Sequence, residues 1–314
     1  MSENKNTPYY YNNYSTYLKN LFHERVQKLS IDGGFTCPNR DGSISSGGCT
    51  FCNNDSFTPQ YCRKTEGIYN QINEGIKFFD HKYKTKKYLA YFQSYSNTYA
   101  TLDVLKRKYE EALSHPKIYG LIIGTRPDIV SNELLNYLED LASTFYINIE
   151  YGVESTNDNI LKSINRGHTY ETSIDAIKRT ANRNIIIGAH LIFGLPGEDQ
   201  ESTLKGALEL CKLPINVLKL HQLQIINGTK MAEQYQENPS AFKLYTADDY
   251  LEFIAKLISH MPLDIYLERF VNQSPAEYLI APKWHLKNYE FTNKLENILE
   301  QRGITQGCKF NPRG

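Results

Sequence analysis

Short apolar runs alternate with amphipathic stretches along most of this chain, beginning near Val26. An apolar run of roughly four to eight residues fits a buried strand, whereas apolar positions every three or four residues fit one helix face. Strands are predicted on this basis at residues 26–31, 88–93, 120–124, 147–152, 186–191 and 217–222. Helices are predicted between them, at residues 66–79, 103–114, 131–143, 170–182 and 200–212. This alternation is typical of a parallel sheet and not of a helical bundle or a β-sandwich.

The pattern becomes less regular after residue 262, where one more strand candidate, at 264–267, precedes a loop-rich tail. The chain has 314 residues, which is enough for one barrel-type domain with a small extension. We therefore predict an N-terminal lead-in at 1–20, a core domain at 21–262 and a C-terminal extension at 263–314 that caps the core. The predicted fold class is α/β, with a partial barrel of six βα units.

The charges balance, with 35 lysines and arginines against 35 aspartates and glutamates. A nucleic-acid partner would therefore have to meet a local basic patch. Residues 81–88 (HKYKTKKY) are one candidate, and Arg302, Lys309 and Arg313 add charge near the C-terminus, although a solvated helix end is the commoner meaning of such a run. The start of the chain does not resemble a signal peptide and no apolar run is long enough to cross a membrane, so we expect a cytoplasmic protein that binds no membrane.

Three of the six cysteines follow the first predicted strand directly, in FTCPNRDGSISSGGCTFC. Eleven residues separate Cys37 from Cys49, and two separate Cys49 from Cys52. Loops that follow the strands of a parallel barrel carry the chemistry, so this loop is well placed to hold a cofactor. Three thiolates can bind three irons of a four-iron cluster and leave the fourth iron open to another ligand. The spacing therefore favours a reactive iron–sulfur cluster.

The same cysteines allow other sites. Nine residues separate Cys52 from Cys62, and four cysteines could form a structural zinc site. Structural zinc sites usually contain two short Cys-x-x-Cys pairs, however, and this sequence has one. A disulfide is a further alternative, disfavoured in a reducing compartment. We interpret Cys62, Cys211 and Cys308 as buried, unreactive thiols.

Several passages resemble the radical S-adenosylmethionine (SAM) superfamily, and within it the bacterial YtqA/YhcC group, which is related to the radical SAM domain of the Elongator catalytic subunit. These passages are LSIDGGFTCPNRDG, GGCTFC, YFQSYSNTYA, GTRPD, YGVES, INRGH, HLIFGLPGE and LKLHQLQIINGT. The resemblance covers nearly the whole chain and implies a partial (β/α)6 TIM-like barrel of radical SAM type. It also implies that Cys37, Cys49 and Cys52 bind a [4Fe–4S] cluster, which cleaves SAM to generate a 5′-deoxyadenosyl radical that takes a hydrogen atom from the substrate.

The resemblance implies that four other residues bind SAM. Arg166, in INRGH, resembles the arginine that pairs with the SAM carboxylate. Glu154 is a candidate contact to the ribose or amino group, and His190 stands where related enzymes place a polar ribose contact. Gln93 ends the second predicted strand, where many relatives bind the amino group through glycines. The structural alternatives are an ion pair for Glu154, a solvated side chain for Arg166 and a hydrogen-bonded core position for His190.

Alternate residues of a strand face the same side of a sheet. Glu150 and Glu154 fall on a polar face of the fourth predicted strand, which we expect to line the barrel interior, while Tyr151 falls on the apolar face. By the same alternation, Lys219 and His221 share a face of the sixth strand and are expected to point inward toward the substrate.

The relationship to Elongator implies that the substrate is the 5-substituent of a wobble uridine in tRNA. Such a base must leave its stack to meet a radical inside a barrel. The implied partners are therefore tRNA and an electron donor such as flavodoxin or ferredoxin. Two other functions stay open: a radical SAM enzyme that acts on a small metabolite or a porphyrin-like molecule, and a zinc-stabilised RNA-binding protein without catalytic activity.

Overall fold

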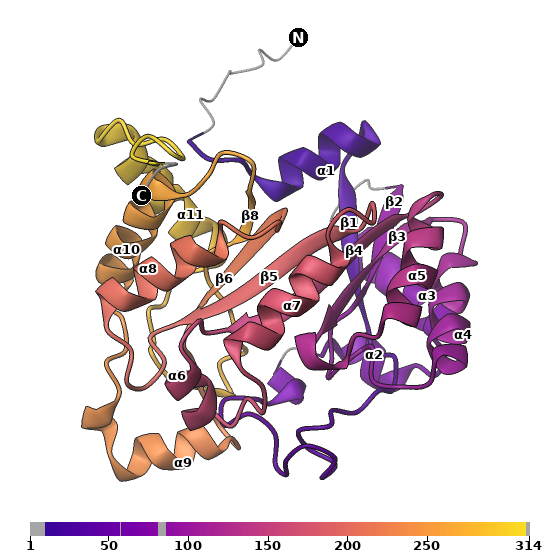
Figure 1. The fold of residues 1–314 in the computed structure, drawn as a ribbon, viewed down its shortest axis with the longest axis horizontal. Helices are drawn as coiled ribbons and strands as arrows, with labels where there is room; N and C mark the ends of the chain where they lie inside the picture. Colours follow the sequence, from indigo (N-terminus) through magenta and orange to yellow (C-terminus); the bar gives the residue numbers. More distant parts are fainter. Residues whose placement is uncertain (1–9, 57, 81–85, 312–314) are drawn as a thin grey trace.

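The computed structural model describes residues 10–56, 58–80 and 86–311, and within them seven parallel strands form one curved sheet (Figure 1). The strand order is β1-β2-β3-β4-β5-β6-β8, so the strands of this sheet lie in the order in which they occur along the chain, with β7 left out. Their bounds are Val26–Ile31, Lys87–Phe92, Ile118–Thr125, Tyr146–Glu154, Ile186–Phe193, Val217–Gln222 and Tyr266–Arg269. The predicted α/β architecture is confirmed, and the sheet has one strand more than the six of the predicted core.

The five predicted helices are present and cover the outer face of this sheet. They are α3 (Ile68–Asp80), α4 (Leu102–Leu113), α5 (Asn132–Ala142), α7 (Tyr170–Thr180) and α8 (Gln200–Leu210). Capping fixes where two of them begin: Ser131 accepts a hydrogen bond from the Leu134 amide at the start of α5, and Asp199 accepts two at the start of α8.

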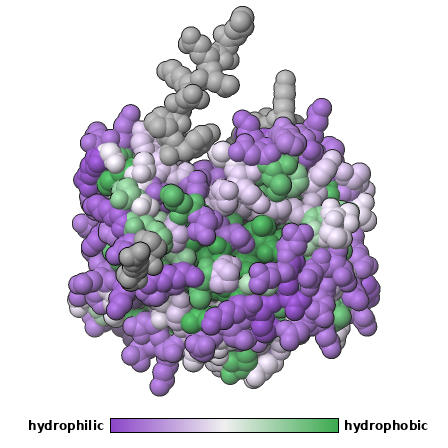
Figure 2. All heavy atoms as spheres, turned by 45° about the horizontal axis from the view of Figure 1, so that its top comes forward, coloured by the Kyte–Doolittle hydropathy of each residue, from purple (hydrophilic) through white to green (hydrophobic). Residues whose placement is uncertain are grey.

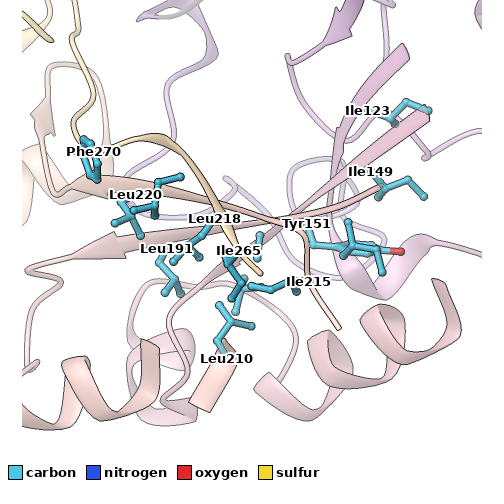
Figure 3. Packing of buried hydrophobic residues seen from close by; sticks show 14 of the residues in the cluster. Ile123, Ile149, Tyr151, Leu191, Leu210, Ile215, Leu218, Leu220, Ile265 and Phe270 are labelled. Carbon is cyan, nitrogen blue, oxygen red and sulfur yellow. The ribbon is translucent and has the colours of Figure 1, made fainter. Parts of the chain in front are cut away.

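The main hydrophobic core lies between the sheet and these helices. Figure 3 shows part of it, including Ile149 and Tyr151 of β4, Leu191 of β5 and Leu210 of α8. Strand residues of the opposite parity are therefore left to line the interior of the half-barrel.

The sequence analysis missed several helices. They are α1 (Tyr14–Phe22), α2 (Gln60–Lys64), α6 (Asp158–Ser163), α9 (Lys230–Glu237), α10 (Ala247–His260) and α11 (Asn288–Gln301). The expectation of a loop-rich tail is wrong where α11 forms, because Phe291, Leu295 and Leu299 recur every four residues and are buried. Strand β8 begins two residues later than predicted and joins the main sheet beside β6.

Smaller elements complete the fold. β7 (Ile225–Ile226) and β9 (Leu279–Ala281) form an antiparallel pair, and short 3-10 turns lie at Asn54–Ser56, Pro127–Ile129 and Pro239–Ala241. Helix α1 contacts both β1 and β8, the two edge strands of the sheet. Figure 1 shows α1 at the end of the half-barrel opposite to α6 and α9.

The surface is mostly hydrophilic. Figure 2 brings the α1 side forward and shows polar side chains around a smaller group of hydrophobic ones near the middle of this face. None of the helices in the described part of the chain combines the length and the hydrophobicity needed to span a membrane.

Candidate active site

A cavity lies where the strands end, and its lining comes from the last residues of β3 to β6, from β8 and from the loops that follow the strands. This is the edge at which parallel α/β barrels place their chemistry. The cavity brings together all seven residues predicted to hold a cofactor: Cys37, Cys49, Cys52, Gln93, Glu154, Arg166 and His190. The structure thus places these residues around one space, while their individual roles stay predictions.

The loop that carries the three cysteines is tightly folded. Gly48 has a φ of 83°, and a Cβ atom there would stand 2.9 Å from the Arg40 side chain, so glycine is needed. Arg40 in turn donates a hydrogen bond from Nη2 to the Cys52 carbonyl oxygen at 2.6 Å. Asn165, just before Arg166, donates from Nδ2 to the Gly48 carbonyl oxygen at 2.9 Å. The loop is therefore fixed against the segment between α6 and α7.

Two of the three cysteine sulfurs accept hydrogen bonds from side chains. Cys49 Sγ lies 3.6 Å from Asn39 Nδ2 and 3.5 Å from Arg166 Nη1. Cys52 Sγ lies 3.7 Å from Asn54 Nδ2. N–H donors aimed at sulfur stabilise thiolates and tune the clusters they bind. Sequence reasoning missed Asn39 and Asn54, because only the fold of the loop turns their amides toward the sulfurs.

The three cysteines fit a cluster better than a single metal ion. Among the described residues, no group of three His, Cys, Asp or Glu side chains is arranged to hold one ion. In a four-iron cluster each cysteine binds a different iron, so the thiols must surround the cluster and need not converge on one point. Cys62, the fourth ligand of the zinc alternative, lies outside the cavity lining and donates its S–H to the Ser30 carbonyl oxygen at 3.1 Å.

The other cysteines divide as follows. Cys62 and Cys211 are buried, as expected for inert thiols, and burial raises the pKa of each thiol to about 12. Cys308 is exposed, so the expectation that it is buried is wrong. At the cavity, burial and the neighbouring Cys49 raise the pKa of Cys52 to about 11, although the Arg40 guanidinium opposes the shift.

Arg166 links the cysteine loop to the end of β4. Its side chain donates to Cys49 Sγ and to the Gly152 carbonyl oxygen, and Nη2 lies 3.8 Å from Glu154 Oε1. Burial opposes its charge, but Cys49 and Glu154 outweigh this and hold the pKa of the guanidinium above its ordinary value. Arg166 is only 6% exposed, so the alternative of a solvated arginine is wrong. Glu154 therefore forms the ion pair of the alternative interpretation and also lines the cavity, so the two interpretations are compatible.

A cluster of four charged residues fills the interior of the half-barrel beside His190. This interior charge cluster consists of Lys28 on β1, Glu150 on β4, Lys219 on β6 and Glu268 on β8. Glu150 accepts from Lys219 at 2.9 Å, and Lys28 lies 3.4 Å away. Glu268 lies 2.6 Å from Lys28 and 3.3 Å from Lys219. The cluster thereby joins the two edge strands of the open sheet.

The surroundings of Glu150 favour its charged form. Burial favours a neutral Glu150, but Lys219, Lys28 and His190 outweigh it and keep the pKa of Glu150 well below its ordinary range. His190 Nε2 lies 2.8 Å from a Glu150 oxygen, so His190 is a hydrogen-bonded interior histidine that also lines the cavity. His221 lines the cavity as predicted, and burial together with Arg269 holds its pKa well below its ordinary value.

The remaining predicted positions are Gln93 and the basic residues. Gln93 lines it and accepts a hydrogen bond from Ser30 Oγ at 3.1 Å. Residues 81–85 of the basic stretch and Arg313 lie outside the described residues. Arg302 is bound by both carboxylate oxygens of Glu252 at 2.6 and 2.7 Å, so its charge is already neutralised.

Family models match both parts of the chain. The radical SAM superfamily model matches residues 37–208, and the radical SAM C-terminal domain model matches residues 215–301. The chain belongs to the radical SAM superfamily. Its cofactors are a [4Fe–4S] cluster and SAM, and the thiols and N–H donors described above fit the cluster.

Relatives of nearly equal length match almost the whole chain. The chain is 31% identical to YtqA of Bacillus subtilis over 305 residues, covering 97% of this chain and 94% of YtqA. It is 32% identical to YhcC of Escherichia coli over 296 residues, covering 94% of each. The expected relationship to the YtqA/YhcC group is confirmed.

Matches of lower identity include an Elp3 structure and a tRNA acetyltransferase. The solved structure of Methanocaldococcus infernus Elp3, with its N-terminus deleted, matches with a TM-score of 0.66 at 20% identity and covers 90% of this chain and 64% of that one. This likeness shows a shared fold. A tRNA uridine(34) acetyltransferase of Methanocaldococcus jannaschii is 26% identical over 205 residues, 64% of this chain and 36% of that protein.

Proposed function

We propose that this radical SAM enzyme modifies the 5-substituent of the wobble uridine in tRNA. The observation that carries the proposal is the match to a tRNA uridine(34) acetyltransferase over 64% of this chain, since the name of that protein specifies the nucleoside at position 34. The aligned segment is 36% of that protein, so the relationship concerns a shared part and not its whole activity. The shared part supports a common substrate more directly than a common product.

The shape of the site is compatible with this substrate. The cavity lies at an edge of the half-barrel and has both buried and partly exposed lining residues, such as Gly152 and Tyr95. A base in an unpaired anticodon loop can turn away from its neighbours and present its 5-substituent to such a cavity. A paired base inside a helix could not reach it.

Several residues of the chain have a role in this proposal. When bound, the cluster and SAM supply the one-electron chemistry that removes a hydrogen atom from the substrate. Cys37, Cys49 and Cys52 hold the cluster, and Arg166 orients Cys49 through its hydrogen bond to Sγ. Arg166, Glu154, His190 and Gln93 are the proposed SAM contacts around the same cavity.

The interior charge cluster holds the His190 side chain in position. Glu150 holds the His190 ring at 2.8 Å and is itself held by Lys219. These contacts fix His190, the proposed ribose contact, and they also fix Glu150, which holds it.

Comparing the modified nucleosides of tRNA from wild-type and deletion cells tests the proposal. We expect the deletion strain to accumulate a precursor at the wobble uridine, detected by mass spectrometry of digested tRNA. A plasmid encoding Cys308→Ala should restore the wild-type profile, and one encoding Cys49→Ala should not, because Cys308 is exposed and Cys49 lines the cavity. An unchanged tRNA profile in the deletion strain would refute a tRNA substrate.

A further inference from the structure

Tyr95, at the cavity, has a backbone conformation that tyrosine rarely adopts. Its φ is 64°, in the left-handed region that favours glycine and asparagine. A tyrosine there carries a steric cost, and such a cost is usually retained where the side chain has a function. The ring is 39% exposed, so burial in the core does not account for it.

The backbone around Tyr95 is held firmly. The Tyr95 amide donates to Asn54 Oδ1 at 3.0 Å, and the same Asn54 side chain donates to Cys52 Sγ. On either side, Ser94 Oγ lies 2.8 Å from Thr58 Oγ1, and the Ser96 amide donates to the Thr36 carbonyl oxygen at 3.2 Å. The loop after β2 is therefore attached to the cysteine loop on both sides of Tyr95.

The Tyr95 ring, by contrast, is not held by the residues that the structure describes. Among them, its hydroxyl makes no hydrogen bond and its ring makes no aromatic contact, although Tyr95 lines the cavity. Both neighbours in the chain, Ser94 and Ser96, are buried, so the ring projects from a fixed base. A half-exposed ring on a rigid backbone suits the binding of a flat partner.

A positive charge lines the same cavity as the ring. Arg40 is fixed there through its hydrogen bond to the Cys52 carbonyl oxygen. Aromatic rings next to arginines are the usual means of binding unpaired bases, by stacking and by attraction to phosphate.

We propose that Tyr95 is a stacking platform for the target nucleobase at the mouth of the cavity. The base would lie flat on the ring while its 5-substituent projects inward, past the cysteine loop that fixes Tyr95. This inference rests on the proposed function, because it takes the substrate to be an unpaired base in RNA. It assigns base recognition to a residue that neither binds the cluster nor is a proposed SAM contact.

The test compares Tyr95→Phe with Tyr95→Asn in the full chain with its cluster reconstituted. Asparagine tolerates a positive φ, so the second variant should keep the backbone while removing the ring. The probe is an anticodon stem-loop RNA with 2-aminopurine at the wobble position, whose fluorescence falls when the base stacks. Loss of one stacked base weakens binding roughly 5- to 100-fold. We expect this loss for Tyr95→Asn, together with loss of quenching, and near wild-type binding for Tyr95→Phe.

The controls separate this proposal from its premise. Iron content and SAM cleavage without RNA should be the same in both variants and the wild type. Wild-type affinity and quenching in Tyr95→Asn would overturn the stacking role while leaving the tRNA function in place, and so would equal losses in Tyr95→Phe. A loss of activity in Tyr95→Asn that appears only with flavodoxin as reductant would indicate that Tyr95 contacts the electron donor. This result would also overturn the stacking role. A wild-type protein that neither binds this RNA nor modifies the same RNA with uridine at the wobble position would reject both proposals.

Discussion

The interior charge cluster and the cysteine loop border the same cavity, yet their polar groups are partnered differently. In the charge cluster, Glu150 and Glu268 each contact both Lys28 and Lys219, and these four residues stand on strands. At the cysteine loop, the contacts are single N–H donors aimed at sulfur, and they come from loops. Polar atoms near the cysteine loop also lack hydrogen-bond partners within the described residues: Asn39 Oδ1, Arg126 Nη1, Arg166 Nε and His168 Nε2.

This difference indicates what each region needs. Buried polar groups are normally satisfied, and those without partners point to an absent ligand or water. In the charge cluster Glu268 Oε2 also lacks a hydrogen bond, but it lies 2.6 Å from Lys28 Nζ, so every carboxylate there is paired with a charge of the protein. Changes in the cluster should therefore act on folding. The cysteine loop is incomplete, so changes there should act on the cofactors and much less on folding. The predictions below test this division.

The largest effect is expected from Cys49→Ala. Loss of a cluster ligand should lower bound iron and sulfide and reduce 5′-deoxyadenosine formation by more than about 100-fold, which exceeds the 10- to 100-fold typical of losing an outer partner of a ligand. The melting temperature of the metal-free protein should stay close to that of the wild type. Cys308→Ala, the exposed cysteine, is the matched control and should keep both iron and activity. Zinc without sulfide in the wild-type protein would contradict the cluster.

The next effect is expected from Glu150→Ala, which leaves Lys28 and Lys219 with only the Glu268 carboxylate and so one positive charge in excess. Removing one partner of a buried ion pair typically costs about 3–5 kcal/mol of unfolding free energy. Urea unfolding of the metal-free protein measures this cost. Glu252→Gln is the control: it breaks a surface pair with Arg302 whose side chains are about half exposed, and should leave the midpoint almost unchanged. Equal midpoints for Glu150→Ala and the wild type would contradict a structural role for the cluster.

A smaller effect is expected in the pH dependence of stability. The ordinary pKa of a glutamate is 4.5, and Lys219, Lys28 and His190 hold that of Glu150 well below this value in the folded chain. Below pH 4.5 the unfolded chain therefore binds a proton at this position that the folded chain does not, so stability falls as the pH falls. Glu150→Gln removes this contribution. The stability difference between wild type and Glu150→Gln should shrink from pH 7 to pH 3; a constant difference would contradict the assigned pKa.

The two regions also differ in how well the sequence predicts them. The cysteines could be found from their spacing alone, and the strands from apolar runs such as 120–124, which lies within β3, because both signals are local. The pairing of Lys28 with Glu268 could not be predicted from the sequence. These residues lie on the two edge strands of the sheet and meet only because the sheet curves.

Helix α11 is a different case, because Phe291, Leu295 and Leu299 recur every four residues and pack against α10. This local signal could have predicted the helix. Asn39 and Asn54 carry no sequence signal for sulfur binding, since asparagine in a glycine-rich loop ordinarily indicates only a turn. What depends on contacts between distant segments needed the structure.

The smallest effect is expected from Asn39→Ala, which tests whether the loop tunes the cluster that it holds. Asn39 Nδ2 is one of two side-chain donors to Cys49 Sγ, so its loss should leave the ligand in place with Arg166 as the remaining donor. N–H donors to sulfur favour the reduced cluster, which carries more negative charge, so the midpoint potential should become more negative. A hydrogen bond contributes about 1 kcal/mol, and this corresponds to about 40 mV or less for one electron.

A redox titration followed by electron paramagnetic resonance measures the shift in Asn39→Ala. Asn159→Ala is a suitable control, because Asn159 is exposed on α6, away from the cavity lining. If Asn39→Ala lost its iron, as expected for Cys49→Ala, Asn39 would be needed to build the site and not to tune it. If the potential stayed unchanged with full iron content, the Asn39 contact would be structural only, and the tuning would be left to Arg166 and Asn54.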